Sequence, residues 1–496
     1  MRITNSMMTN NMMSNINKNK NNLSTLDEQY STGKKIQRPS QDPIIAVRAL
    51  KLRTNLAELN QYYEKNIPDA RSWMDVTESA LTNINTILKD INTKCVQGSN
   101  DPLTVSDRTS IVEALKQYKQ QIYQEGNSNY AGRHVFTGYK TNTSLTFSEA
   151  TKNLEYTIKE NFTGKDLEAF STVKGELDLN SNLATPGVDK SPVLNNGFRL
   201  RLSYDNLTNL AAGIEYTTLD TTTTPPTKNP PVTVAVPPAN VILSTDAKNL
   251  DIKPDQVYFV KDTGEMIIGK DVYDQMKSAV DISVSYEKKE FNEGDLRPEH
   301  YFTCDVKEGS TVTSYEKSDQ QIQYEINFNQ KLSVNTQAKD AITHDIGRNI
   351  DEIIESVKAV EAVETKIAEV KKRLEDTTIN PTEKERLTKL LGYFETELTL
   401  KNGIMQGKFE NGITGSSKSQ EKVNIAVADL GSRYVRLDLT ESRLSSQQVD
   451  FEDLLTNNED VDMAETFIRL SSAENIYTAS LNAASKVVRN NLLDFL

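Results

Sequence analysis

The stretch STGKKIQR at residues 31–38 contains residue types that could bind a phosphate group. A serine and a threonine precede Gly33, and two lysines follow it, as in part of a nucleotide-binding loop. A P-loop needs the pattern GxxxxGK[ST] between a strand and a helix, because its backbone N–H groups surround the phosphates. The first glycine of that pattern is missing, and helix-like sequence comes before the stretch. The sequence therefore favours a basic turn in which Lys34, Lys35 and Arg38 are solvated or face a neighbouring subunit.

Cysteine and histidine, which most often ligate transition metals or act as nucleophiles, are scarce and scattered. The chain has two cysteines, Cys95 and Cys304, and three histidines, His134, His300 and His344. None of them has the spacing of a zinc site, and residues 141–330 contain neither a nucleophile elbow nor a glycine-rich phosphate loop. We expect free thiols, no metal, no cofactor and no enzymatic activity.

The composition indicates a large protein of several domains with little affinity for polyanions. The 496 residues are 36% hydrophobic and 26% charged, and the net charge is −13. That net charge disfavours binding to nucleic acid or to anionic membranes. No apolar run approaches the roughly 20 residues of a membrane span, and the first residues lack the apolar core of a signal peptide. We expect no membrane span and no Sec-dependent export.

Apolar residues with helical spacing occur near both ends of the sequence. The first set is Met12, Ile16, Leu23, Leu26 and Tyr30, with Asn19 at the missing core position. The second set is Met463, Phe467, Leu470, Tyr477, Leu481, Ala484, Val488 and Phe495. An Asn-rich helix is marginal in water by itself, so its order should come from partner packing. The matching periods predict that the two helices cover each other, and both sets are candidate interface residues.

A break follows the first helix, and its residues predict a hinge. Gly33 can end that helix, and Pro39 lies in the turn. Asp42 and Pro43 form an N-cap and first-turn pair for the next helix. We assign these four residues to geometry and not to catalysis.

The rest of the chain alternates between helical and strand-like patterns. Helical periodicity continues to about residue 126, and we expect Pro68 to kink or divide the helix and Ser106 to cap the next one. Short alternating runs between 141 and 330 predict a β-rich domain, in which TTTTPPTKNPPVTVAVPP is an exposed loop or arm. Helical periodicity returns beyond 338, with a new start at Pro381 and a Gly/Ser break at 412–419. The fold class is therefore α+β.

Several motifs in the same order resemble the flagellin superfamily, specifically its branch of hook-associated proteins 3 at the hook–filament junction. The opening MRITNSMMTNNMMSNINKN, the segment LSTGKKIQRPSQDPIIAVRALKLR, the turn NYAGRHVFTGYKT and the final segment EDVDMAETFIRLSSAENIYTASLNAASKVVRNNLLDFL are similar to that branch. The resemblance covers roughly residues 1–140 and 322–496. One departure is Gln41, where the family usually has an acidic residue, and the helical hairpin near 340–410 is longer than usual.

The resemblance implies a long coiled-coil-like helical rod, formed from both ends of the chain, with an inserted β-rich variable domain. The implied divisions are 1–43 for the inner N-terminal helix and hinge, 44–140 and 331–457 for the rod, 141–330 for the variable domain, and 458–496 for the inner C-terminal helix. The implied function is a structural junction protein that templates flagellin assembly, with a filament-forming flagellin as the alternative. Implied partners are the other hook-associated junction protein, flagellin, copies of itself in a ring and a cytoplasmic export chaperone. Export would use the flagellar type III route, which leads to the hook–filament junction.

Overall fold

The computed structural model describes residues 5–100, 103–181, 183, 191–211, 213–220, 227–376 and 379–493. The chain divides into two compact units. The first unit comprises Met1–Ala70, Tyr324–Leu332 and Val435–Leu496, and the second comprises Arg71–Gln323 and Ser333–Tyr434. Long helices flank a β-rich middle, so the α+β fold class is confirmed.

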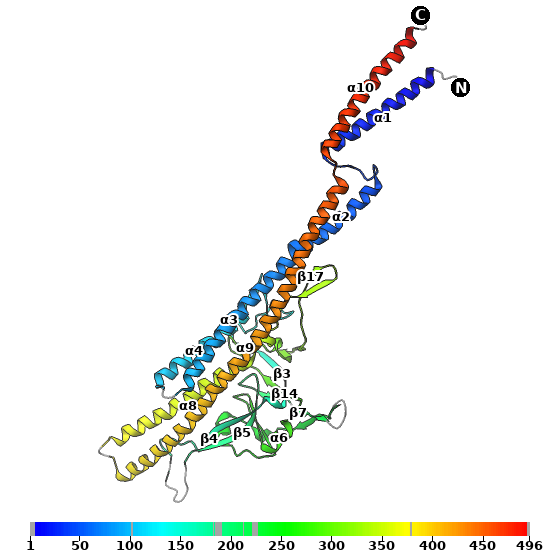
Figure 1. Ribbon diagram of the computed structural model, residues 1–496. Coiled ribbons are helices and arrows are strands. Elements are labelled where there is room, and N and C mark those ends of the chain that lie inside the picture. The colour runs from blue at the N-terminus through cyan, green and yellow to red at the C-terminus, as the bar shows by residue number, and fades with distance from the viewer. Residues whose placement is uncertain are drawn as a thin grey trace. The chain divides into compact units, whose positions relative to one another are not determined.

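The first unit is mainly helical. It contains α1 (Asn5–Thr32), α2 (Pro43–Gln61), the last part of α9 (Pro381–Glu459) and α10 (Met463–Leu493). Helices α1 and α10 pack side by side, although they are far apart in the sequence (Figure 1). Most of the hairpin of β17 (Gln323–Asn327) and β18 (Gln330–Ser333) also belongs to this unit. The Asn66 side-chain amide donates to the Glu325 carbonyl at 2.8 Å and holds the hairpin against the helices.

A π-helical turn lies directly before Pro68, where the sequence analysis expected a kink or a division of the helix. This turn, Tyr62–Asn66, joins α2 to α3 (Ile67–Ser99) without a loop. At its end the Ile67 N–H donates to the Tyr62 carbonyl, five residues earlier. A π-turn widens the helix by one residue, and such turns accommodate a residue that the regular pattern cannot.

The second unit has a helical part built from α3, α4 (Val105–Gly126), the short α7 (Ala338–Ala341), α8 (His344–Leu374) and most of α9. Trp73, Leu81, Ile84 and Leu88 on α3 are completely buried. Polar contacts add to this packing: Lys119 on α4 lies 2.7 Å from the Asp351 carboxylate on α8.

Two details of these helices differ from the sequence-based expectation. The N-cap of α4 is Thr104, which forms a capping box with Asp107, and not Ser106. The Gly/Ser segment at 412–419 does not break the chain, because α9 runs without interruption through all 79 of its residues. A Cβ atom at Gly412 would lie 2.8 Å from the Cys95 sulfur, so the missing side chain allows close helix packing. Tertiary packing of this kind outweighs the low helix propensity of glycine.

The β-rich part of the second unit contains two sheets that share one core. The seven-stranded sheet has the order β10-β7-β14-β3-β15-β16, with β6 also paired to β14, and the five-stranded sheet has the order β11-β12-β13-β5-β4. The bounds are β3 (Leu154–Phe162), β4 (Leu167–Lys174), β5 (Val193–Arg201), β6 (Asn209–Leu210), β7 (Ile214–Thr217), β10 (Val232–Val234), β11 (Val241–Ile242), β12 (Val257–Val260), β13 (Glu265–Ile268), β14 (Asp281–Lys288), β15 (Thr303–Glu308) and β16 (Thr311–Tyr315). Alternate residues of both sheets, such as Ile158 and Phe259, meet in this core.

Smaller elements complete the β-rich part. The pairs are β1 (Asn129–Tyr130) with β2 (Arg133–His134), and β8 (Leu219–Asp220) with β9 (Thr227–Lys228). Helix α5 (Ser244–Lys248) packs on the outer face of the five-stranded sheet, and α6 (Lys270–Met276) follows β13. The expected Thr/Pro arm lies partly outside the described residues, and its described part contributes β9 and the edge strand β10.

Candidate subunit interface

Helix α1 turns the predicted apolar stripe toward α10. Ile16 is buried, and Met12, Leu23 and Leu26 are half-buried. Asn19, predicted to fill the missing core position, is also half-buried. Tyr30 lies at the end of the stripe, with its ring centroid 5.7 Å from that of Phe467 on α10. The spacing on α1 therefore predicted four covered residues correctly, whereas the fifth, Tyr30, is 37% exposed.

On α10 the covered face agrees with the predicted stripe only in part. Thr466 and Ala473 are buried, and they alternate with the half-buried Leu470 and Tyr477 at steps of four, three and four residues. This heptad-like spacing could have identified the covered face from the sequence. It was missed because threonine and alanine are less hydrophobic than the neighbouring large residues.

The other predicted residues on α10 lie outside this covered face or at its margin. Ala484 is half-buried, whereas Met463, Phe467 and Leu481 are 46%, 53% and 44% exposed. The side chain of Val488 and all of Phe495 lie outside the described part of the chain.

Both helices therefore keep large apolar side chains on surfaces that their pairing leaves uncovered. On α1 these are Met7, Met8 and Met13, and on α10 they include Ile468 and Ile476, each about half exposed or more. Exposed apolar side chains that gather in one region are a common feature of protein–protein contacts. The pair therefore leaves apolar side chains of both helices in contact with solvent.

The two connectors next to the helix pair bind each other through their backbones, and we call this region the crossover (residues 33–35 and 459–461). Gly33 ends α1 with a φ of +72°, a conformation that glycine adopts without strain. Its carbonyl accepts from the Val461 N–H at 3.0 Å, and the Lys35 N–H donates to the Glu459 carbonyl at 2.6 Å. Lys34 and Asp460 pair between these bonds as an isolated β-bridge. The crossover thus joins the chain before α10 to the chain after α1.

Charged side chains reinforce the crossover. The Lys34 amine pairs with Asp460 and lies 3.4 Å from Glu459, whose carboxylate also lies 2.6 Å from the Arg53 guanidinium. The Glu459 side chain is only 6% exposed, and the hydrogen bond to Asp460 raises the pKa of Lys34 despite partial burial. Lys34 thus binds acidic groups of its own chain, which the sequence analysis did not predict, and its side chain remains 43% exposed.

Caps fix where the helices on either side of the crossover begin. The Asp42 carboxylate accepts from the N–H groups of Ile44 and Ile45 at 2.9 and 3.2 Å, with Pro43 as the first residue of α2. Asp462 caps α10 in the same way, accepting from the next backbone N–H groups at 2.9 and 3.1 Å. Pro39 lies exposed in the intervening turn. The predicted residues of the hinge therefore lie together at one bend, and Asp462 is the equivalent cap that the sequence analysis missed.

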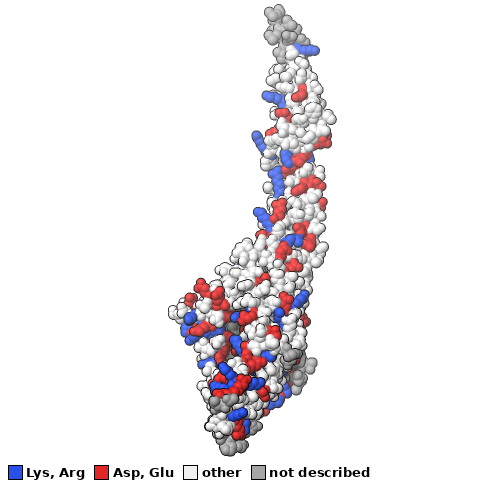
Figure 2. All heavy atoms as spheres, turned by 90° about the vertical axis from the view of Figure 1, so that its left-hand side faces the viewer, with Lys and Arg blue, Asp and Glu red and all other residues white. Residues whose placement is uncertain are grey.

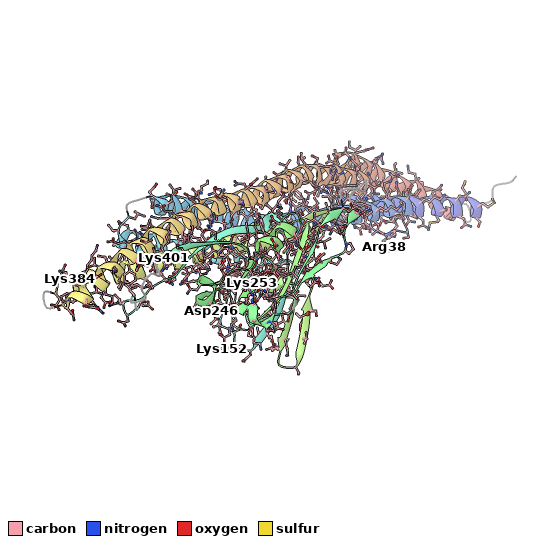
Figure 3. The ribbon with its side chains drawn as sticks, turned by 90° about the horizontal axis from the view of Figure 1, so that it is seen from below. Arg38, Lys152, Asp246, Lys253, Lys384 and Lys401 are labelled. Carbon is pink, nitrogen blue, oxygen red and sulfur yellow. The ribbon has the colours of Figure 1, made fainter. Side chains whose placement is uncertain are left out.

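Gln41 takes part in this bend although the family usually has an acid there. Its side-chain oxygen accepts from the N–H groups of Gln37 at 2.7 Å and Arg38 at 3.1 Å. Its amide nitrogen donates to the Glu28 carboxylate at 3.3 Å. Arg38 itself lies in the connector between α1 and α2 (Figure 3). An amide both accepts and donates here, whereas a carboxylate at this position would repel Glu28.

Figure 2 shows basic and acidic side chains interspersed over the face in view. Among the described residues, no helix combines the length and apolarity needed to cross a bilayer, and no group of three or more histidine, cysteine or acidic residues is arranged to hold a metal ion. Both cysteines are buried free thiols, and burial raises each thiol pKa to about 12.

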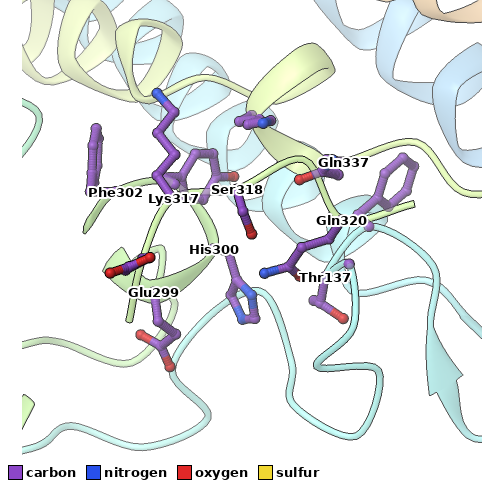
Figure 4. Close-up of a pocket in the computed structure, with 13 residues that line it drawn as sticks. Thr137, Glu299, His300, Phe302, Lys317, Ser318, Gln320 and Gln337 are labelled. Atoms are coloured by element: carbon purple, nitrogen blue, oxygen red, sulfur yellow. The ribbon is translucent and has the colours of Figure 1, made fainter. Parts of the chain in front are cut away.

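A small polar pocket in the second unit is lined by Thr137, Glu299, His300, Gln320 and Gln337, among others (Figure 4). Burial lowers the pKa of His300 to about 4, so its ring is neutral at physiological pH. The cavity measures about 10 Å³, which is room for about one water molecule. This pocket has no space for an organic substrate.

Comparison with known proteins agrees with this arrangement. Residues 3–141 match the family model of the bacterial flagellin N-terminal helical region. Flagellar hook-associated protein 3 of Salmonella typhimurium is 34% identical over 152 residues, covering 30% of this chain and 47% of that protein. The Escherichia coli hook-associated protein 3 is 35% identical over 123 residues, covering 25% and 38%. A flagellin of Clostridium tyrobutyricum is 34% identical over 126 residues, covering 25% and 33%.

The chain thus spans less than half the length of the curated relatives it matches. A solved structure of hook-associated protein 3 from Legionella pneumophila aligns at 10% identity with a TM-score of 0.31, covering 82% of this chain and 97% of that one. Residues 3–141 are therefore similar to a flagellin-type N-terminal helical region. The resemblance to the hook-associated protein 3 branch is confirmed by the matches to that protein in two species.

Proposed function

We propose that this protein is a structural component of the bacterial flagellum that joins the hook to the filament and templates flagellin assembly. The support comes from the matches to hook-associated protein 3 and from the helix pair α1–α10. The protein acts through contacts between chains, so we assign it neither an enzymatic role nor a cofactor.

The distribution of exposed apolar side chains is the observation that carries this proposal. Among the residues that the structure describes, 27 large hydrophobic side chains are exposed, and 17 of them belong to the first unit, which holds under a third of the chain. Exposed apolar surface costs free energy in water, so a protein that keeps it in one region stabilises itself by covering that region. We infer that the first unit is the surface through which copies assemble into a ring.

The same surface fits the partners that the family resemblance implies. The axial neighbours would be flagellin on one side and the other hook-associated junction protein on the other. Before export, a cytoplasmic chaperone would cover the apolar flanks of α10. The final location would be outside the cell at the hook–filament junction.

Leu481→Asp and Phe467→Asp test the proposal. Both side chains are about half exposed within the chain, so a carboxylate there is tolerated by the isolated protein. In an assembled seam the same carboxylate would be buried without a partner, which costs several kcal/mol. We expect normal circular dichroism, no assembly by sedimentation and no filaments retained on the hook. Asn482→Asp, an exposed neighbour with the same change in charge, is the matched control and should assemble normally.

The alternative function is that of a filament-forming flagellin, which the match to the Clostridium protein favours. The two functions differ in the length of the homopolymer. Purified junction protein should stop at short rings, whereas a flagellin should form long filaments visible by electron microscopy. Long homopolymers would overturn the junction function and retain the assembly surface.

A further inference from the structure

An exposed face of α2 in the first unit combines apolar and basic side chains. The exposed residues Ile44, Val47, Lys51 and Thr54 follow one another at steps of three, four and three, so they lie along one side of the helix. Arg48 and Leu50, which are also exposed, flank this row on its two sides. The three apolar side chains are each more than half exposed. We call these six residues the basic face of α2.

A second exposed face, on the last part of α9, combines apolar and acidic side chains. Six exposed residues follow one another at alternating steps of four and three: Val435, Leu439, Ser442, Ser446, Val449 and Asp453. Asp450, which is also exposed, lies beside the end of this row. The valines and the leucine are each more than half exposed. We call these seven residues the acidic face of α9.

Both faces remain uncovered after the helices have packed within the chain. Ala49 and Leu59 of α2 are buried, as are Leu437 and Leu444 of α9, and these residues lie on other sides of the two helices. Within the described part of the chain, no hydrogen bond or ion pair is formed by the side chains of Arg48, Lys51, Asp450 and Asp453. A second apolar row at heptad spacing, on a helix that already buries one, indicates a further helical partner.

The charged residues of the two faces lie at a similar height along the first unit. Helices α2 and α9 run side by side in opposite directions, and the Asn458 amide donates to the Ile45 carbonyl at 3.1 Å (Figure 1). Lys51 follows Ile45 by two turns of α2, and Asp453 precedes Asn458 by a similar length of α9. With a rise of about 1.5 Å per residue, the basic and acidic side chains differ in height by roughly one helical turn or less. Neighbouring copies at one level would therefore bring these charges together.

We propose that the basic face of α2 in one copy packs on the acidic face of α9 in the next copy. The apolar rows would cover each other, and the lysine and arginine would meet the two aspartates. A contact between two different faces of the same chain is head-to-tail, and its repetition gives a ring where the rotation closes. Contact of two α2 faces or of two α9 faces would instead oppose like charges, which disfavours a twofold dimer. The proposal rests on the self-association proposed above and names the two surfaces that make it.

Charge reversal in full-length protein tests this contact. Arg48→Glu/Lys51→Glu and Asp450→Lys/Asp453→Lys should each weaken self-association about tenfold or more in sedimentation, because like charges then meet across the contact. All four substitutions in one chain restore opposite charges and should restore association. An equimolar mixture of the two reversed proteins should also associate, because each supplies the face that complements the other.

The matched control is Lys89→Glu/Lys116→Glu, which makes the same change in net charge at two exposed lysines of the second unit and should leave association unchanged. Circular dichroism of every variant checks that its helices are intact. Normal association of either reversed protein, or failure of either rescue, would overturn the contact. If Leu481→Asp abolishes assembly while the reversed proteins assemble normally, the assembly function stands without this contact. Wild-type protein that stays monomeric at every concentration would refute both.

Discussion

The buried carboxylate of Glu459 predicts strong coupling between its two cationic partners. Lys34 and Arg53 have side chains that are 43% and 61% exposed, so loss of either ion pair alone should cost about 1 kcal/mol or less. Loss of both leaves a carboxylate that is 6% exposed, with its Oε1 atom lacking a hydrogen bond, and should cost about 3–5 kcal/mol. The double variant should therefore lose more stability than the sum of the two single variants.

Native-state hydrogen exchange can measure this coupling locally, which matters because a protein of several units has no single free energy of unfolding. The informative amides are those of Lys35 and Val461, which donate across the crossover. We expect an excess protection loss of about 1–3 kcal/mol in Lys34→Ala/Arg53→Ala relative to the sum of the single variants.

Two further variants show whether the Glu459 charge causes this coupling. Introducing Glu459→Gln should remove most of the excess, because no charge is then left buried. A control cycle at the exposed pair Arg469–Glu465 should be additive. Additive losses at the crossover, within about 0.5 kcal/mol, would refute the reasoning.

Three other changes test separate features. Asp42→Ala removes the cap of α2 and should cost about 1 kcal/mol, seen as faster amide exchange in the first turn of that helix but not in α10. Gly412→Ala should destabilise the second unit by about 1–3 kcal/mol in thermal unfolding, because the new methyl group would clash with the sulfur of Cys95. Gly407→Ala is the control: its methyl group would meet no neighbour, so this change should stabilise the unit slightly. Burial raises the pKa of Glu160 to about 7, so its contribution to stability is complete below pH 4.5 and is lost as the pH rises through 7. In thermal unfolding, the stability of Glu160→Gln relative to the wild type should therefore increase between these pH values. Parallel pH profiles of the two proteins would contradict this.

The sequence predicted the α1 stripe correctly, because isoleucine, leucine and methionine recur there at helical spacing. On α10 it predicted the covered residues Leu470, Tyr477 and Ala484 but missed Thr466 and Ala473, because their side chains are small or polar. Phe467 is more apolar than either of them, yet it is more exposed. An apolar pattern shows which residues need cover, but it does not distinguish cover within the chain from cover by another chain.

Long-range contacts account for the other differences. The glycines and serines at 412–419 predicted a break because glycine and serine have a low helix propensity. The helix is continuous because this segment packs closely against α3 and α8. Glu459 and Asp460 carried no local signal, because their partners Lys34 and Arg53 lie more than 400 residues earlier. Strand order in the two sheets likewise depends on pairings, such as β3 with β14, that no local pattern encodes.

The pairing of α1 with α10 also sets an order of events in time. Roughly 430 residues separate the two helices, and closing a loop of that length in an unfolded chain costs about 5 kcal/mol in entropy. That cost falls only after the intervening residues have folded, so the helix pair and the backbone bonds of the crossover should form late. Until then the methionines and isoleucines of both helices face water or another protein. The latest-forming contact of the chain is therefore also the one whose apolar side chains stay uncovered for the longest time.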